Sequence, residues 1–312
     1  MAVALAALAV LVAAAVVLRS GDRAEARSVD LSPYEGLGMW VDVFDFEPAY
    51  QGPGQQVPVT VSALDDMAAR GVTAVYLQAA RDDDTTRGLV DEVLLSAWLE
   101  RAHDLGIGVV AWFLPKFRSV DADLAKLVEV HEFRSPRGDR FDGLAVDIEE
   151  TQVVTDVAER NRRLVELSTR LREAVGDDVA LGANVLPTVQ IEVVNPSFWP
   201  DFPWEELAPL YDVWVPMTYW TLRKEEWRDA ERYVTETVER MRDRLGDPDA
   251  PVHPIGGIAD EVTAADVEGY ARALAATSAL GGSWYDYRTM TPVVWDALAN
   301  VTAPAATSDA TP

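Results

Sequence analysis

The stretch FDGLAVDIEE, residues 141–150, is a short apolar run that begins at a glycine and ends in carboxylates. In a strand, successive side chains point to opposite faces. One face of this run would carry Leu144, Val146 and Ile148, and the other would carry Ala145, Asp147 and Glu149. Both faces are apolar until the carboxylates, as in a parallel strand that helices cover. The stretch therefore predicts a buried parallel strand with Asp147 and Glu149 together at its end.

Similar apolar runs occur along the rest of the chain and alternate with longer amphipathic stretches. The eight predicted strands are residues 37–44, 72–79, 107–114, 143–148, 179–186, 213–219, 252–258 and 282–285. Between them, Ser62 to Asp65 and Thr263 to Asp266 have the form of capping boxes that open helices. Alternating strands and helices without a break in composition predict an α/β fold, a single-domain (β/α)8 TIM barrel.

Three parts of the chain are expected. Residues 1–28 contain an apolar run without charge, Met1 to Leu18, which fits a signal peptide or an N-terminal membrane anchor. Residues 29–303 would form the barrel, and residues 304–312 are predicted to be a disordered tail. The barrel is accordingly expected outside the cytoplasm, either secreted or anchored to the cell membrane.

The charge of the chain limits its partners. It has 27 Lys and Arg against 52 Asp and Glu, a formal net charge of -25. Such a surface repels nucleic acid and anionic lipid, so we expect no nucleic-acid partner and membrane contact only through the N-terminal segment. The absence of cysteine excludes disulfides. His103, His131 and His253 stand apart from any ligand spacing, so no metal and no other cofactor is predicted.

Functional residues of a barrel are expected at the C-terminal ends of its strands, where the loops converge. The carboxylates, amides and aromatic residues that the sequence places there, predicted to bind substrate, are Trp40, Asp42, Gln78, Trp112, Asn184, Met217, Trp220, Trp284 and Asp286. Tryptophan rings stack on the apolar faces of sugars, although packing in the core is the alternative for each of them. The strand ends therefore predict a glycan as partner.

Asp147 and Glu149 are the candidate catalytic carboxylates. Two carboxylates on one face repel each other, and partial burial should keep a proton on one of them near neutral pH, as a general acid requires. Alternation along the strand favours Glu149 over Glu150 for this role. The alternative is a structural ion network of these carboxylates with Arg81 or Lys116.

The motif Asp142-Gly143-Leu144-Ala145-Val146-Asp147-Ile148-Glu149 resembles the signature Asp-Gly-x-Asp-x-Asp-x-Glu of glycoside hydrolase family 18, the chitinase-like TIM barrels. Met217-Thr218-Tyr219 resembles the Met-x-Tyr-Asp motif of that family, and Trp284 matches its last-strand tryptophan. The resemblance implies a substrate-assisted mechanism, in which the acetamido group of the substrate is the nucleophile. It implies that Glu149 protonates the glycosidic oxygen and Asp147 orients the acetamido group. Tyr219 would hydrogen-bond to that group, and Trp284 would form the floor of the sugar site.

Two positions of these motifs depart from the family. Ala145 stands where the family has its first Asp, which helps the middle Asp change protonation, and Trp220 stands where the family has an Asp that contacts the acetamido group. Residues 111–115 also lack the family's Ser-Gly-Gly motif. The chain therefore resembles a divergent member.

The sequence thus predicts an extracellular glycoside hydrolase-like protein that cleaves or binds a glycan, with N-acetylhexosamine-containing glycans as the candidate class. Two alternatives stay open. One is a retaining glycosidase in which Asp42 or Asp286 is a nucleophile about 5 Å from Glu149. The other is a non-catalytic glycan-binding barrel, which Ala145 and Trp220 favour.

Overall fold

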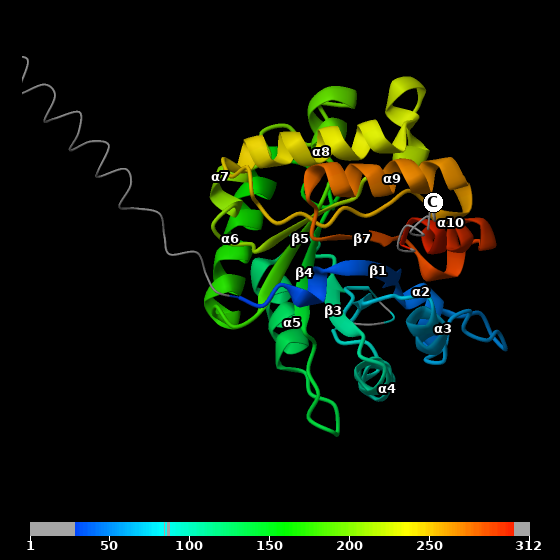
Figure 1. The fold of residues 1–312 in the computed structure, drawn as a ribbon. Coiled ribbons are helices and arrows are strands. Elements are labelled where there is room, and N and C mark those ends of the chain that lie inside the picture. The colour runs from blue at the N-terminus through cyan, green and yellow to red at the C-terminus, as the bar shows by residue number, and fades with distance from the viewer. Residues whose placement is uncertain (1–28, 84, 86–87, 303–312) are drawn as a thin grey trace, which may run out of the picture.

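The computed structural model describes residues 29–83, 85 and 88–302, so the predictions for residues 1–28 and 304–312 fall outside the described residues. A parallel sheet in the order β6-β5-β4-β3-β2-β1-β7 forms its centre (Figure 1). Its strands are β1 (Gly36–Val41), β2 (Ala74–Gln78), β3 (Gly108–Phe113), β4 (Gly143–Ile148), β5 (Ala180–Val185), β6 (Val213–Pro216) and β7 (Gly281–Trp284). Every neighbouring pair is parallel, and the predicted TIM-barrel-like α/β fold is confirmed.

The prediction of a regular seventh strand at residues 252–258 is wrong. This segment makes only isolated parallel bridges, from Val252 to Trp214 and from Ile255 to both Met217 and Ser283. Pro251 and Pro254 have no backbone N–H, so the segment cannot form a regular ladder. It nevertheless lies between β6 and β7 and joins the two edges of the sheet. The described residues therefore form seven regular strands and one bridging segment, where the sequence predicted eight strands.

Helices cover the outside of the strands. The longer ones are α3 (Ala63–Ala69), α4 (Glu92–Asp104), α5 (Val120–Glu132), α6 (Val157–Val175), α8 (Ala230–Leu245), α9 (Ala264–Thr277) and α10 (Pro292–Thr302); the short ones include α2 (Val43–Phe46), α7 (Trp204–Leu207), η4 (Trp220–Leu222) and η7 (Tyr287–Thr289). Figure 1 shows α4 and α5 on one side of the strands, with α8 and α9 side by side on the opposite side. The capping box at Thr263 and Asp266 is present, whereas the Ser62 side chain caps no N–H. None of the described helices has both the length and the apolar composition needed to cross a membrane.

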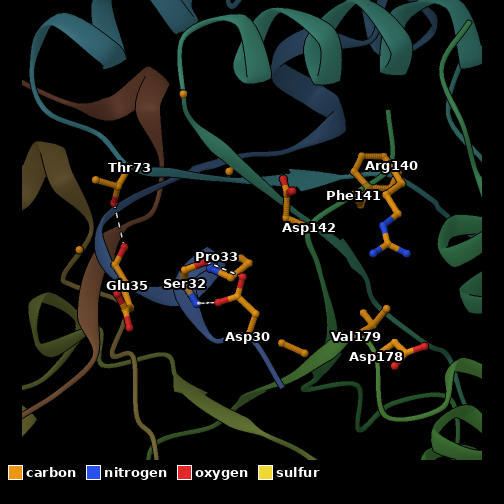
Figure 2. A pocket seen from close by; sticks show the side chains of 14 residues that line it. Asp30, Ser32, Pro33, Glu35, Thr73, Arg140, Phe141, Asp142, Asp178 and Val179 are labelled. Carbon is orange, nitrogen blue, oxygen red and sulfur yellow. Dashed lines mark hydrogen bonds between the residues drawn. The ribbon is translucent and has the colours of Figure 1, made fainter. Parts of the chain in front are cut away.

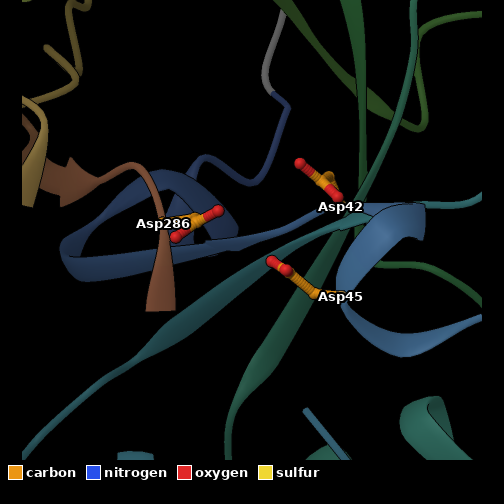
Figure 3. Close-up of side chains that lie close together, drawn as sticks. All are labelled: Asp42, Asp45 and Asp286. Carbon is orange, nitrogen blue, oxygen red and sulfur yellow. The ribbon is translucent and has the colours of Figure 1, made fainter. Parts of the chain in front are cut away.

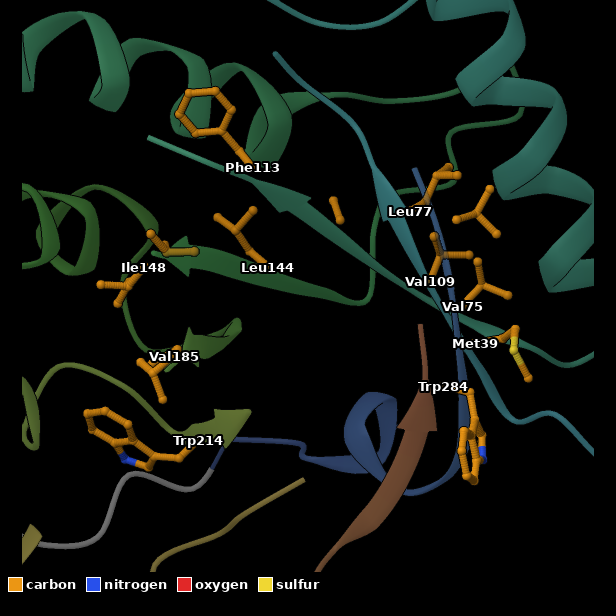
Figure 4. Close-up of a cluster of buried hydrophobic side chains, with 14 of the residues drawn as sticks. Met39, Val75, Leu77, Val109, Phe113, Leu144, Ile148, Val185, Trp214 and Trp284 are labelled. Carbon is orange, nitrogen blue, oxygen red and sulfur yellow. The ribbon is translucent and has the colours of Figure 1, made fainter. Parts of the chain in front are cut away.

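The strands bury both of their faces, as the apolar runs predicted. Leu144, Val146 and Ile148 belong to the outer layer, between the sheet and the helices (Figure 4). Ala145 belongs to a separate inner layer with Tyr34 and Trp40. The alternation predicted for β4 is therefore confirmed, and Asp147 continues the inner face.

Tyr34 closes the inside of the barrel at the start of the strands. Its hydroxyl donates a hydrogen bond of 2.9 Å to the carbonyl of Leu144. At Gly182 a Cβ atom would lie 2.8 Å from the Tyr34 ring, so only glycine allows this close approach. With this end filled, the space inside the barrel is left at the C-terminal ends of the strands.

Candidate active site

A cavity of about 280 Å³ opens at the C-terminal ends of the strands, and we call it the cup. Its lining includes most of the predicted site residues, namely Trp40, Asp42, Gln78, Trp112, Asp147, Glu149, Asn184, Met217 and Tyr219. These residues come from six different parts of the chain, and the parallel barrel brings them together because all of its strands end on one side. Phe44, Arg81, Leu114 and Tyr285 complete the lining.

Trp220, Trp284 and Asp286 do not line the cup. Trp284 is fully buried in the outer layer, where its ring lies 6.0 Å from the Trp220 ring and 5.1 Å from the Tyr270 ring (Figure 4). Trp220 is buried in the same layer. On β7, alternation turns Trp284 toward the helices and leaves the next residue, Tyr285, on the inner side. Tyr285, and not Trp284, therefore lines the cup, although the family resemblance implies a tryptophan as the floor of the sugar site.

Asp147 and Asn184 occupy paired positions on β4 and β5, and the two residues are 5% and 2% exposed. Asp147 Oδ1 and Asn184 Oδ1 are both buried, and neither has a hydrogen-bond partner among the described residues. A buried acceptor left without a donor costs about 1–3 kcal/mol. A ligand that brought N–H or O–H groups into the cup would recover that cost.

Burial controls the protonation of the two candidate catalytic carboxylates. Burial, followed by the charge of Glu149, raises the pKa of Asp147 well above its ordinary value. Burial, followed by the charge of Glu150, also raises the pKa of Glu149. The pair therefore holds a proton at pH values at which exposed carboxyl groups have lost theirs, which is the property of a general acid.

The cations near the cup pair with other carboxylates. Lys116 Nζ lies 3.3 Å from Glu150 Oε2, and Arg81 pairs with Asp83. Although burial opposes it, hydrogen bonds from the Gln152 backbone and from Lys116 lower the pKa of Glu150. Among the described residues, Lys116 and Arg81 thus form ion pairs with Glu150 and Asp83, and neither pairs with Asp147 or Glu149. This arrangement counts against the structural ion network that the sequence left open.

Aromatic residues form a fixed wall of the cup. Trp40 Nε1 donates to Ser283 Oγ at 2.9 Å, and Trp112 Nε1 donates to the Tyr76 carbonyl at 3.2 Å. Tyr285 donates its hydroxyl to Asp42 Oδ2 at 2.7 Å. These bonds hold the rings in one orientation, as a rigid sugar-binding surface requires.

Tyr219 lies close enough to the candidate catalytic carboxylates for their charges to affect it. Burial, followed by the charges of Asp147 and Glu149, raises the pKa of Tyr219 well above its ordinary value. Its hydroxyl therefore remains a hydrogen-bond donor over the whole range in which a glycosidase works.

Tyr285, Phe44 and Leu114 line the cup, although the sequence analysis did not predict them as site residues. Tyr285 directly follows the tryptophan that the family resemblance favoured, and alternation along β7 places the two side chains on opposite faces without indicating which of them faces inward. Phe44 lies in α2, directly after β1, and the Arg81 guanidinium lies 4.4 Å from the centre of its ring. The predicted strand 37–44 ended at Phe44, but the sequence analysis did not include this residue among the candidates for substrate binding.

Three carboxylates lie together beside the cup, although the sequence predicted no metal site. The ligand oxygens of Asp42, Asp45 and Asp286 all lie within 4.8 Å of one another (Figure 3). Burial raises the pKa of Asp45 to about 7, and the charges of Asp286 and Asp42 add to the effect. Oxygen ligands of this kind suit hard cations such as Ca²⁺ and Mg²⁺.

Larger hollows lie away from the C-terminal ends of the strands. One, of about 570 Å³, lies at the starts of β1, β3 and β5, and its lining includes Thr73, Asp142 and Val179 (Figure 2). Another, of about 600 Å³, is lined by residues of α6, α7 and α8. The N-terminal face of a barrel serves stability rather than catalysis, so the smaller cup is the candidate active site.

No protein-family model matches the chain, and no curated protein matches its sequence. Solved structures do match its fold. The glycoside hydrolase domain of PgaB (BpsB) from Bordetella bronchiseptica is 13% identical with a TM-score of 0.58, over 86% of this chain and 98% of that one. A GH18 chitinase from Pseudoalteromonas aurantia is 13% identical with a TM-score of 0.56, over 85% and 99%.

YKL-39, solved in the presence of the chitooligosaccharide GlcNAc4, is 11% identical with a TM-score of 0.55, over 86% of this chain and all (100%) of that one. At identities this low, the TM-scores show that the fold is shared. The fold of this chain is therefore similar to that of these three structures, one of which is a GH18 chitinase.

Proposed function

We propose that this protein is a glycoside hydrolase that uses Glu149 as its general acid. The observation that carries the proposal is the environment of the β4 carboxylates. Asp147 and Glu149 line the cup with raised pKa values, whereas the neighbouring cation, Lys116, is paired with Glu150. The fold, which is that of chitinase-like barrels, adds support.

The proposed reaction is substrate-assisted. Glu149 gives its proton to the glycosidic oxygen as the bond to the anomeric carbon breaks. The acetamido oxygen of the substrate forms the new bond to that carbon. Asp147 Oδ1, which has no donor within the described residues, accepts the acetamido N–H, and the Tyr219 hydroxyl donates to the acetamido group. Water then attacks the anomeric carbon, loses a proton to Glu149 and restores the acetamido group.

The proposed substrate is a glycan that contains N-acetylhexosamine. An acetamido group offers an N–H donor, which the unpaired oxygens of Asp147 and Asn184 lack. Trp40, Trp112 and Tyr285 supply aromatic faces for the sugar rings. YKL-39, which shares the fold, was solved with an N-acetylglucosamine oligomer, and this observation favours the same class of sugar.

A crystal structure of the protein soaked with N-acetylglucosamine oligomers tests the proposal. We expect the acetamido group between Asp147 and Tyr219, with the glycosidic oxygen within hydrogen-bond distance of Glu149. A sugar bound with its acetamido group facing solvent, or bound outside the cup, would refute the substrate-assisted route.

A glycan-binding barrel without catalysis is the second candidate, because Ala145 is fully buried on the inner face of β4. No carboxyl group at that position can take up a proton from Asp147.

A conventional retaining hydrolase would need another carboxylate in the cup. Asp42 lines the cup and Asp286 does not, so Asp42 would be the nucleophile in that case.

We further propose that the barrel works outside the cytoplasm, as the apolar run from Met1 to Leu18 suggests. Fractionation of the native cells tests this location. Barrel recovered in the extracellular or membrane fraction supports it, and full-length protein in the cytosol with an intact N-terminus contradicts it.

A further inference from the structure

Asp42, Asp45 and Asp286 form a buried cluster that the proposed hydrolysis does not use as a unit. Their residues are 8%, 2% and 7% exposed. Asp42 and Asp45 flank the start of α2, and Asp286 follows β7, which pairs with β1. Figure 3 shows the three carboxylates pointing toward one another, and their ligand oxygens lie within 4.8 Å of each other.

Donors fix the orientation of each carboxylate in the cluster. The backbone N–H of Phe44 donates to Asp42 Oδ1 at 2.8 Å, and the Tyr285 hydroxyl donates to Asp42 Oδ2. The backbone N–H of Thr289 donates to Asp286 Oδ1 at 2.9 Å. Arg288 Nη1 donates to Asp45 Oδ1 at 3.3 Å. The cluster is therefore preorganised and does not depend on mutual contact alone.

Asp45 Oδ2 is the atom whose environment indicates a missing ligand. It is buried, and no donor among the described residues reaches it. The group beside it is the carboxyl of Asp286, and two carboxyl groups can share a hydrogen bond only when one of them holds a proton. Arg288 brings one positive charge to three carboxylates, and its side chain is 56% exposed, so solvent screens that charge. Buried carboxylates with so little compensation need a proton or a cation between them.

We propose that Asp42, Asp45 and Asp286 bind a divalent cation, with Ca²⁺ preferred. Oxygens that share a Ca²⁺ ion at about 2.4 Å can lie at most about 4.8 Å apart, and all three ligand atoms meet this limit. Ca²⁺ accepts irregular sets of oxygen ligands and completes them with water. Mg²⁺ requires nearly ideal octahedral geometry, which three carboxylates fixed by other bonds do not supply.

The proposed ion would connect two loops at the edge of the cup. It would link the start of α2 to the segment after β7, and Asp42 would pass its effect to Tyr285 through their hydrogen bond. Ca²⁺ binding should therefore stabilise the fold and the sugar-binding wall together. This inference does not depend on the hydrolytic reaction, because an ion would bind whether or not the cup cleaves glycans.

Calorimetric titration of the chelator-treated full chain with CaCl2 tests the proposal, with MgCl2 as the parallel titration. We expect one Ca²⁺ ion per chain, weaker Mg²⁺ binding, and a melting temperature that rises by roughly 5 °C at a hundredfold excess over Kd. Asp45→Asn should abolish the titration signal. Asp243→Asn removes an exposed carboxylate of α8 and should leave it unchanged.

Three outcomes would overturn the proposal. They are no Ca²⁺ binding by the wild-type protein, equal binding by wild type and Asp45→Asn, or equal loss in Asp45→Asn and Asp243→Asn. A proton shared by Asp45 and Asp286 would produce the first outcome. Should Asp45→Asn fail to fold, wild-type crystals soaked in TbCl3 give the answer. Anomalous density among the three carboxylates supports the site, and density only elsewhere contradicts it.

Discussion

Glu149 and Glu150 are neighbours in sequence, but they have opposite environments at the end of β4. Glu149 lines the cup and has a raised pKa, whereas Glu150 lies 3.3 Å from Lys116 Nζ and has a lowered pKa. The difference follows from strand alternation, which turns adjacent side chains to opposite sides. Glu149 is therefore the candidate acid, whereas Glu150 belongs to a structural ion pair with Lys116. A substitution at Glu150 can serve as the control for the same substitution at Glu149.

Asp147→Asn should separate the catalytic routes. If the acetamido group is the nucleophile, the rate of chitooligosaccharide hydrolysis should fall by a hundredfold or more, since the amide cannot supply the charge that orients and stabilises it. If Asp42 is the nucleophile, the loss should be mild, about tenfold or less. Measured kcat values for wild type, Asp147→Asn and Asp42→Asn distinguish the two routes. If Asp42 is the nucleophile, Asp42→Asn should have a lower kcat than Asp147→Asn.

The same substitution should change how stability depends on pH. The pKa of Asp147 is raised in the folded state. Its contribution to the free energy of unfolding is therefore fully present below the ordinary pKa of about 3.9, and it is lost as pH rises through the folded-state pKa. Asparagine does not ionise. Asp147→Asn should therefore melt above wild type at about pH 8, with a smaller difference at about pH 4. A difference that is equal at both pH values would show that ionisation of Asp147 does not destabilise the fold.

Tyr285→Phe should destabilise the protein by about 1–3 kcal/mol and weaken sugar binding, because Asp42 Oδ2 loses its donor in a buried place. Urea denaturation measures the first effect and oligosaccharide titration the second. Tyr76→Phe is the matched control. The Tyr76 hydroxyl is buried, and no partner for it exists among the described residues, so its removal should cost nothing. Equal losses in both variants would mean that the bond to Asp42 is unimportant.

Trp284→Ala should lower the free energy of unfolding by about 3–5 kcal/mol, since the ring is fully buried between Trp220 and Tyr270. Trp227 is only partly buried and serves as the comparison, with a smaller loss expected for Trp227→Ala. Both values come from urea denaturation. A Trp284 variant of wild-type stability that had lost sugar binding would instead favour the role implied by the family resemblance.

The local patterns of the sequence predicted the features that depend on a single strand. The alternation of β4 placed Ala145 and Asp147 on the inner face, and the rule that parallel strands end together gathered most of the cup. Features that depend on register between distant segments were not predictable in this way. Trp284 and Tyr285 exchange sides if the four-residue strand β7 shifts by one position.

Two further features arise only in the folded chain. Residues 252–258 are apolar enough for a strand, but Pro251 and Pro254 limit them to isolated bridges. The cluster of Asp42, Asp45 and Asp286 joins residues that follow the strands β1 and β7. No motif spacing could indicate that cluster, because its members become neighbours only when β1 pairs with β7.

The rate of glycan hydrolysis by Glu149→Gln, compared with Glu150→Gln, tests the central claim most directly. Glutamine keeps the shape of the side chain and removes the titrating proton, so sugar binding and melting temperature should be nearly unchanged in both variants. Loss of a general acid costs about a hundredfold to ten-thousandfold in rate, and we predict such a loss for Glu149→Gln. For Glu150→Gln we predict a much smaller loss, because the charge of Glu150 only adds to the effect of burial on the pKa of Glu149. A loss of less than about fivefold in Glu149→Gln, well below that range, would contradict the assignment of Glu149 as the acid.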